Sequence, residues 1–127
     1  MQDTNNSSKT TAILGASDDP SRYAYKACKQ LIAHGHPVIL IARRPITVDG
    51  ISSLAQLSDI TGKVDTVTLY INPNLVNEQI NAIIQLAPKR VIFNPGTEST
   101  LAIEKLSAAG IQVVTHCTLI MLQQAEY

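Results

Sequence analysis

The sequence contains no tryptophan, and its other aromatic residues are one phenylalanine and four tyrosines among 127 residues. A buried core must therefore consist of aliphatic side chains, and hydrophobic residues make up 45% of the chain. No apolar run approaches the roughly 20 residues of a membrane-spanning helix, so we expect no membrane association. The length is typical of one domain.

Cysteine and net charge are also scarce. Cys28 and Cys117 are too few for a disulfide scaffold, and their spacing matches no zinc motif. Two thiols in an aliphatic α/β chain favour a reduced, intracellular protein. The ten basic and ten acidic residues cancel, which argues against a nucleic-acid partner. Residues 1–8 are polar and lack the apolar segment of a secretory signal, so we predict a disordered lead, one domain over residues 9–127 and a cytoplasmic location.

Apolar runs that suit buried strands alternate with segments of helical periodicity along the whole chain. Ala24, Ala27, Cys28 and Leu31, for example, follow the i, i+3, i+4, i+7 spacing of one helix face. The strand-like runs lie within residues 10–15, 37–42, 64–71, 90–96 and 111–115. This alternation predicts an α/β fold in which helices cover both faces of a mainly parallel sheet of five or six strands.

Two residue pairs have the pattern of a helix start, which is an N-cap residue followed by proline. They are Asp19-Pro20 and Asn72-Pro73. We therefore expect one helix to begin at Pro20 and another at Pro73.

The middle and the last third of the chain are less regular in pattern. Residues 43–63 are expected to hold a short strand near Ile51 and a short helix capped by Ser53. Thr97 or Ser99 can start the last long helix, because both residue types are favoured at the N-cap position.

In parallel α/β sheets, ligands bind beyond the carboxyl ends of the strands. Gly15 follows the first strand and allows a tight turn, Ser17 offers a hydroxyl, and the helix expected near Pro20 has unpaired amides. Arg22 and Lys26 can add charge-assisted hydrogen bonds to an anion such as a pyrophosphate. The alternative is a plain turn with a capping residue and a solvated arginine. The second and third glycines of the dinucleotide fingerprint are missing, which argues against NAD.

Arg43 and Arg44 follow the second strand. Proteins that bind NAD usually place Asp or Glu there to bond the ribose 2′-hydroxyl. Adjacent arginines would instead attract a phosphorylated ribose, which is present in coenzyme A and in NADP. The alternative is two solvent-facing arginines beyond a buried strand.

With these residues the chain resembles the small CoA-binding-domain proteins, a Rossmann-like group related to the CoA-binding domain of succinyl-CoA ligase α subunits. The similarity extends from about residue 9 to residue 123. Its landmarks are GASDDPSRYAYKA, PVILIA followed by basic residues and proline, DGISSLAQL, TLYINP, FNPGTES and HCTLIML. The resemblance implies a Rossmann-like three-layer αβα sandwich and, as ligand, coenzyme A or an acyl-CoA.

The resemblance also assigns binding residues. The phosphate-binding loop would comprise Gly15, Ala16, Ser17, Pro20, Ser21 and Arg22, with Tyr25 or Lys26 just behind it. The adenosine ribose and its 3′-phosphate would lie near Arg43 and Arg44. The far side of the ligand would be bordered by Asn72, Pro73, Asn94, Pro95 and Gly96. Many relatives carry Asn-Pro after the second strand, where this chain has Arg43-Arg44-Pro45.

The adjacent residues His116 and Cys117 raise the question of catalysis. A histidine can lower the pKa of a thiol, but neighbours on a strand point to opposite faces. We expect Cys117 to be a small buried residue, with a mixed disulfide to coenzyme A as the alternative. The leading hypothesis is a non-catalytic CoA-binding protein without a metal site. The alternatives are an NADP-binding or thiol-dependent enzyme, and a metabolite or redox sensor that docks to a protein partner; a homodimer is compatible with the small size.

Overall fold

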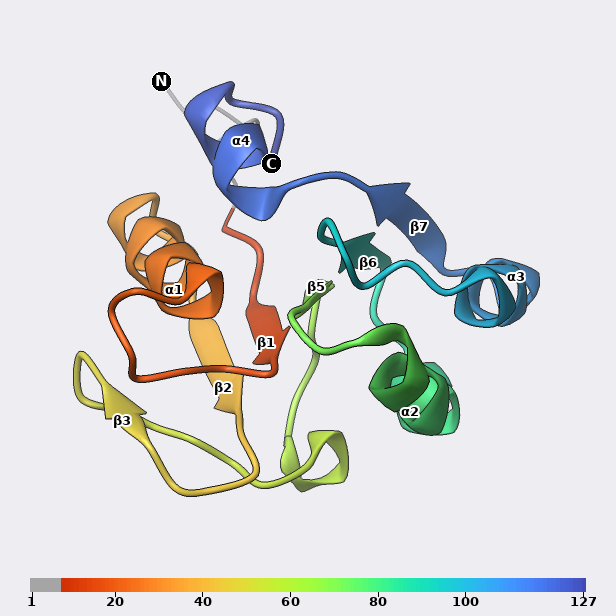
Figure 1. Cartoon of the computed structure of the whole chain (residues 1–127), viewed down its shortest axis with the longest axis horizontal. Coiled ribbons are helices and arrows are strands. Elements are labelled where there is room, and N and C mark those ends of the chain that lie inside the picture. Colours follow the sequence, from red (N-terminus) through yellow and green to blue (C-terminus); the bar gives the residue numbers. More distant parts are fainter. Residues whose placement is uncertain (1–7) are drawn as a thin grey trace.

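Five parallel strands form the central sheet of the computed structural model, which describes residues 8–127 (Figure 1). Their order across the sheet is β2-β1-β5-β6-β7. The strands are β1 (Thr11–Leu14), β2 (Val38–Ile41), β5 (Thr66–Leu69), β6 (Arg90–Phe93) and β7 (Gln112–Thr115). The three inner strands are buried along their whole length, as expected of parallel strands covered on both faces. The predicted parallel sheet is confirmed. The predicted disordered lead lies, apart from Ser8, outside the described residues.

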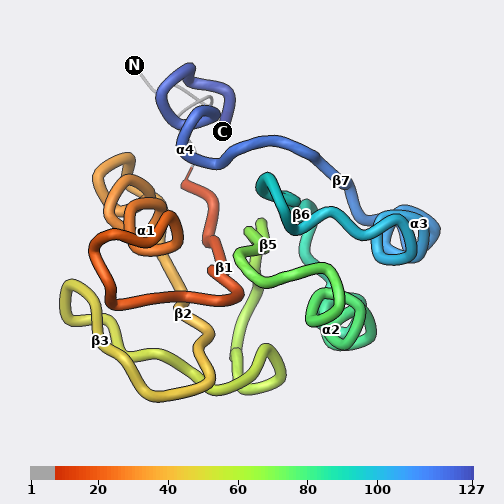
Figure 2. The backbone as a smooth tube through the Cα atoms, viewed as in Figure 1, coloured from red at the N-terminus to blue at the C-terminus, as the bar shows by residue number. Residues whose placement is uncertain are grey.

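Helices cover both faces of this sheet, which confirms the three-layer Rossmann-like sandwich. α1 (Tyr23–Ala33) packs with α4 (Thr118–Gln123) on one face. α2 (Pro73–Leu86), α3 (Thr100–Ala108) and the 3-10 helix η2 (Leu57–Asp59) cover the other. Figure 2 shows the chain after β7 crossing back over the sheet to α4. α4 was not predicted from the sequence.

The side-chain alternation of the strands divides the core between the two faces. Ile13 belongs to the cluster beneath α1 and α4, together with Leu31 of α1. Its neighbours Ala12 and Leu14 belong to the larger cluster beneath α2 and α3, which includes Phe93. This core is aliphatic apart from that phenylalanine and the partly buried tyrosines at its border.

α2 begins as predicted. The Asn72 side chain accepts a hydrogen bond of 2.9 Å from the Leu75 amide, and Pro73 is the first helical residue. Ser99 caps α3 in the same way through the Ala102 amide.

The prediction that α1 begins at Pro20 is wrong. The Asp19 carboxylate accepts hydrogen bonds from the Ser21 amide (2.9 Å) and hydroxyl (2.8 Å), which fold residues 19–21 into a local turn. α1 starts at Tyr23 instead, with Arg22 as its N-cap. Asp19 therefore shapes the turn before α1, and it lies too far from Tyr23 to cap the helix.

A small hairpin separates β2 from β5. It consists of β3 (Thr47–Val48) and β4 (Ile51–Ser52), joined by Asp49 and Gly50, whose positive φ angles suit a two-residue hairpin turn. Lys29 of α1 holds the turn through an ion pair of 2.8 Å to Asp49. The predicted strand near Ile51 is confirmed. The prediction that Ser53 caps the following helix is wrong, because its hydroxyl accepts from the Ile46 amide and Gln56 caps η2.

The last residues of the chain lie at the amino edge of the sheet, against the buried Arg90. The Arg90 guanidinium lies 4.4 Å from the centroid of the Tyr127 ring, and its Nη1 donates to the Tyr127 carbonyl at 2.8 Å. The Tyr127 hydroxyl hydrogen-bonds with the hydroxyl of Thr11. These contacts of Tyr127 hold the end of the segment that follows α4 against the sheet.

Gly15, at the end of β1, is held where no side chain fits. Its φ is +95°, and a Cβ atom there would lie 2.7 Å from the Tyr70 carbonyl oxygen. The amides of Gly15 and Ala16 both donate to the Ile41 carbonyl, at 3.1 and 3.0 Å. The turn therefore lies tightly between the ends of β2 and β5.

We expect Gly15→Ala to lower the free energy of unfolding by about 2–4 kcal/mol, because a strained φ and a backbone clash add together. Gly35→Ala is the matched control. Gly35 also has a positive φ (+84°), but among residues 8–127 no atom lies within 4 Å of the position that a Cβ would take there. Only the backbone strain remains there, about 1–2 kcal/mol. Urea denaturation of both variants checks the difference, and equal losses would contradict the clash.

Candidate functional site

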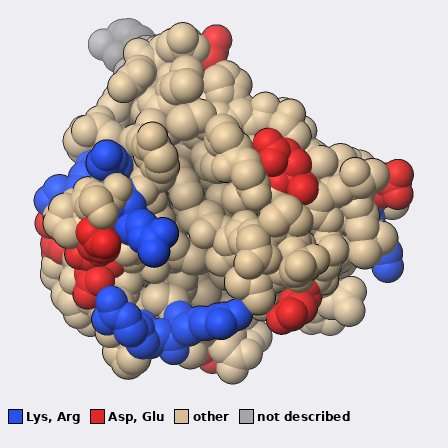
Figure 3. All heavy atoms as spheres, viewed as in Figure 1, with Lys and Arg blue, Asp and Glu red and all other residues tan. Residues whose placement is uncertain are grey.

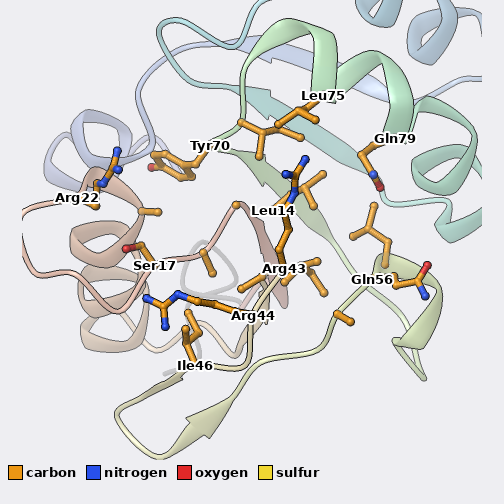
Figure 4. A pocket seen from close by; sticks show the side chains of 18 of the residues that line it. Leu14, Ser17, Arg22, Arg43, Arg44, Ile46, Gln56, Tyr70, Leu75 and Gln79 are labelled. Atoms are coloured by element: carbon orange, nitrogen blue, oxygen red, sulfur yellow. The ribbon is translucent and has the colours of Figure 1, made fainter.

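A cleft of about 1050 Å³ opens at the carboxyl ends of β1, β2 and β5 (Figure 4). The chain runs from β1 outward to β2 and then crosses back to β5 on the other side of β1. This reversal is the topological switch point of the sheet, where open α/β sheets bind ligands. The cleft thus lies where the strand order predicts a ligand site.

The loops after β1 and β2 bring together many of the residues predicted from the sequence. Those that line the cleft are Gly15, Ala16, Ser17, Ser21, Arg22, Arg43 and Arg44. Among residues 8–127, the other predicted residues do not line the cleft. They are Pro20, Tyr25, Lys26, Asn72, Pro73, Asn94, Pro95 and Gly96.

The wall formed by α2 was missed by the sequence analysis. Leu75, Gln79 and Ala82 line the cleft from this helix. Their i, i+4, i+7 spacing marks a second stripe, directly beside the inner stripe that contains Val76 and Ile80. That spacing was readable in the sequence, but it identifies a cleft wall only when the rotation of α2 about its axis is known.

Positive charge is concentrated at this cleft, although the chain as a whole has a net charge of zero. The described lining contains Arg22, Arg43 and Arg44 and no carboxylate. Figure 3 shows Lys and Arg side chains on the α1 side of the hollow and along its lower border. An anionic ligand is therefore favoured here by the local charge.

The two arginines after β2 point in different directions. In Figure 4, Arg43 extends across the cleft toward α2, whereas Arg44 extends along the mouth toward the loop after β1. There the Arg44 Nη2 lies 3.0 Å from Oδ1 of Asp18. The pair together spans both walls of the cleft.

The start of α1 supplies the backbone donors. The amides of Gly15 and Ala16 are already bonded to the Ile41 carbonyl, so the turn itself does not offer them to a ligand. Tyr23 and Ala24 line the cleft from the first helical turn. Within the described residues this turn has neither a side-chain cap nor an acidic residue. Its unpaired amides and the positive end of the helix dipole form an anion-binding feature.

Tyr70 lies in the cleft wall beside Arg22 (Figure 4). Burial raises the pKa of the Tyr70 hydroxyl to about 12. The side chain is therefore neutral near pH 7 and can donate a hydrogen bond.

Asn94 joins three elements behind this wall. Its Nδ2 donates to the Thr68 hydroxyl at 2.7 Å and to the Leu69 carbonyl at 2.9 Å, and its Oδ1 accepts from the Thr118 amide at 2.8 Å. Thr118 and Thr68 also share a hydrogen bond of 2.8 Å. The buried amide of Asn94 therefore ties β5, β6 and the start of α4 together.

His116 and Cys117 are both half-buried and lie outside the described lining of the cleft. The His116 Nδ1 accepts a hydrogen bond of 2.7 Å from the Cys117 amide, and Cys117 is the N-cap of α4. Among residues 8–127 no group of three or more His, Cys, Asp or Glu side chains is arranged to hold a metal ion. The helices of this same part of the chain are all too short or too polar to span a bilayer.

The chain is similar to known proteins in both sequence and structure. A family model described as CoA binding domain matches residues 9–123. One crystal structure, of an uncharacterized protein, shares 46% sequence identity with this chain. Its TM-score is 0.90, and the alignment covers 95% of this chain and 99% of that chain. A protein from Pyrococcus horikoshii OT3 is 28% identical, with a TM-score of 0.89 over 95% of this chain and 86% of that chain.

A more distant similarity concerns a protein with a much longer chain. Acetyl-coenzyme A synthetase 1 of Ca. Korarchaeum cryptofilum is 20% identical and has a TM-score of 0.72. The alignment covers 83% of this chain and 25% of that one. At this level of identity the similarity shows a shared fold.

We expect Asn94→Ala to lower the free energy of unfolding by about 2–4 kcal/mol, because it removes three buried hydrogen bonds and leaves the buried Thr118 amide without its acceptor. Asn81→Ala, on the exposed side of α2, is the matched control and should change stability by less than about 0.5 kcal/mol. Chemical denaturation measures both. A loss in Asn94→Ala no larger than in the control would contradict the structural role of this amide.

The raised pKa of Tyr70 predicts a loss of stability at high pH. The folded protein keeps this proton up to about pH 12, whereas an unfolded tyrosine loses it near pH 10. The contribution is complete below pH 10 and is lost as the pH rises toward 12. Tyr70→Phe should flatten this dependence by up to about 1.4 kcal/mol per pH unit. Urea unfolding between pH 9 and 11.5 tests this, and parallel curves for the two proteins would refute it. Burial also raises the pKa of Tyr127, so the variant retains a residual slope.

Proposed function

The chain belongs to the CoA binding domain family, and from this premise we propose that it binds coenzyme A, free or as an acyl thioester, in the cleft at the carboxyl edge of the sheet. The observation that carries the proposal is the charge of this cleft. Its described lining holds three arginines and no carboxylate in a chain of zero net charge. The anionic part of coenzyme A, a 5′-diphosphate and a 3′-phosphate on one ribose, requires such a surface.

The diphosphate binds at the start of α1. The free amides of the first turn, the hydroxyl of Ser17 and the guanidinium of Arg22 belong to residues that line this end of the cleft. Donors of this kind bind phosphate groups at helix N-termini. Lys26 lies one turn further on, near the ring of Tyr23, and adds positive charge behind the site.

The 3′-phosphate binds between Arg43 and Arg44, on the opposite side of the ribose. Both side chains are exposed at the cleft mouth, and guanidinium groups bind phosphate oxygens in a bidentate manner. A diphosphate at α1 and a phosphate at the end of β2 would flank the ribose from two sides.

The adenine ring binds between the end of β2 and α2. This part of the cleft has apolar walls from Leu57, Ile71 and Leu75 and two side-chain amides from Gln56 and Gln79. Apolar walls with a few placed polar groups are typical of ligand sites, and amides can pair with the edge of a base. A second hollow of about 470 Å³ lies between η2 and α2, so there is additional space for a ligand beside this end of the cleft.

The predicted residues outside the lining act by holding the walls in place. Asn72 and Pro73 start α2 and thereby set the position of Leu75 and Gln79. Asn94 holds β5 to α4 through its buried amide. Pro95 and Gly96 continue from Asn94, and Pro20 and Tyr25 flank the start of α1. The proposal assigns none of these residues a reaction, and it assigns none to Cys117.

Binding of coenzyme A, dephospho-CoA and NADP, measured by isothermal titration calorimetry, tests the proposal. We expect coenzyme A to bind more tightly than dephospho-CoA. Arg43→Ala should weaken the binding of coenzyme A about 10- to 100-fold, the value of a charge-assisted hydrogen bond, with little effect on dephospho-CoA. Lys105→Ala, in the last turn of α3, removes a distant positive charge and should leave both affinities unchanged.

Equal affinities for coenzyme A and dephospho-CoA would remove Arg43 and Arg44 from the 3′-phosphate site. Tighter binding of NADP would identify that dinucleotide as the ligand instead. Binding of none of the three would end the proposal. Native mass spectrometry of the purified protein adds an independent test, because a co-purified ligand would be identified by its mass.

A further inference from the structure

The ion pair between Asp18 and Arg44 lies across the mouth of the cleft. It joins the loop after β1 to the segment after β2, with 3.0 Å between Oδ1 of Asp18 and Nη2 of Arg44. Arg44 lines the cleft, and Figure 4 shows its side chain extended along the mouth toward the loop that contains Ser17. The Asp18 carboxylate is therefore paired with Arg44, one of the two arginines that we propose bind the 3′-phosphate.

Asp18 has no part in shaping its own loop. The hydrogen bonds that fold this loop are made by its neighbours: the Ser17 hydroxyl accepts from the Asp19 amide at 3.0 Å, and the Asp19 carboxylate accepts from Ser21. Among the described residues, the polar partner of the Asp18 side chain is Arg44. Its position is thus explained by the arginine and not by the turn.

A carboxylate and a phosphate compete for the same guanidinium. The pair is exposed, with 73% of the Arg44 side chain and 39% of the Asp18 side chain accessible, and exposed pairs are weak and easily broken. A phosphate offers two oxygens in the geometry that a guanidinium fork prefers, and it carries more charge than a carboxylate. A phosphate can therefore replace Asp18, whereas an uncharged ribose hydroxyl cannot.

We propose that Asp18 is an internal counter-ion that a ligand phosphate displaces from Arg44, so that Asp18 sets how tightly a phosphorylated ribose is held. The inference rests on the proposed function and adds to it a residue that opposes binding. Only a ligand with a 3′-phosphate has to break the ion pair, so only that ligand binds at the cost of its free energy. Asp18 therefore weakens the binding of coenzyme A and leaves the binding of dephospho-CoA unchanged.

The chain contains a matched control for this effect. Lys29 and Asp49 form a second exposed ion pair, with 2.8 Å between Nζ and Oδ1, and the Asp49 side chain is as exposed as that of Asp18, at 39%. Neither residue belongs to the described lining of the cleft. Asp49→Asn removes the same charge as Asp18→Asn from the same half of the molecule, but away from the ligand.

The test is calorimetric titration of the wild-type protein and its variants with coenzyme A and dephospho-CoA at one low ionic strength. Asp18→Asn should bind coenzyme A about 2- to 5-fold more tightly, the effect of one exposed ion pair, and dephospho-CoA unchanged. Asp18→Ser should behave in the same way. Asp49→Asn should match the wild type for both ligands. In an Arg44→Ala background, Asp18→Asn should bring no gain.

Each other result has a separate meaning. If the wild type binds coenzyme A and Asp18→Asn binds it equally or more weakly, the counter-ion role is overturned and the binding function stands. A gain that persists without Arg44 overturns the exchange in favour of general charge repulsion. If no form of the protein binds coenzyme A, the proposed function and this inference both fall.

Discussion

The close contact between Gly15 and the backbone of Tyr70 is the constraint on which the site depends. With no side chain at Gly15, the end of β1 lies directly against the end of β5, while the Gly15 and Ala16 amides bond the end of β2. The Leu14 carbonyl accepts from the Tyr70 amide at 2.8 Å and completes the junction. Three strand ends are thereby fixed at one point, and the loops that leave them diverge. The cleft is the space between these diverging loops.

This junction also decides which groups are left for a ligand. In many glycine-rich turns the backbone itself approaches the phosphate, but here the turn amides are used to join β1 to β2. The groups that we propose to bind an anion lie further along the chain, at Arg22 and the first turn of α1. A single glycine is enough for this arrangement, because its role is to pack against β5. The missing glycines of the dinucleotide fingerprint follow from that role.

The sequence predicted the strands, the two helix layers and the edge of the sheet where the cleft opens, because these depend on local pattern and on a general rule of α/β sheets. Predictions failed where a side chain had two possible partners. Asp19 and Asn72 both precede proline, yet Asn72 bonds the amide three residues ahead and caps α2, whereas Asp19 bonds the residue two ahead and makes a turn. The hydrogen bonds of Asn94 could not be predicted from local pattern either, because its partner Thr118 is 24 residues away in the sequence.

The directions of the two arginines after β2 link the fold to the choice of ligand. Arg43 and Arg44 lie in the bend after β2, where Arg43 reaches toward α2 and Arg44 toward the loop after β1 (Figure 4). With Arg22 on the third side, positive charge surrounds the position that we propose for the ribose. NAD carries its charge in a single diphosphate between two nucleosides and would bring no phosphate to Arg43 and Arg44. Coenzyme A carries phosphate on two sides of one ribose, which matches this distribution. The ion pair of Asp18 with Arg44 is the contact that we propose its 3′-phosphate replaces.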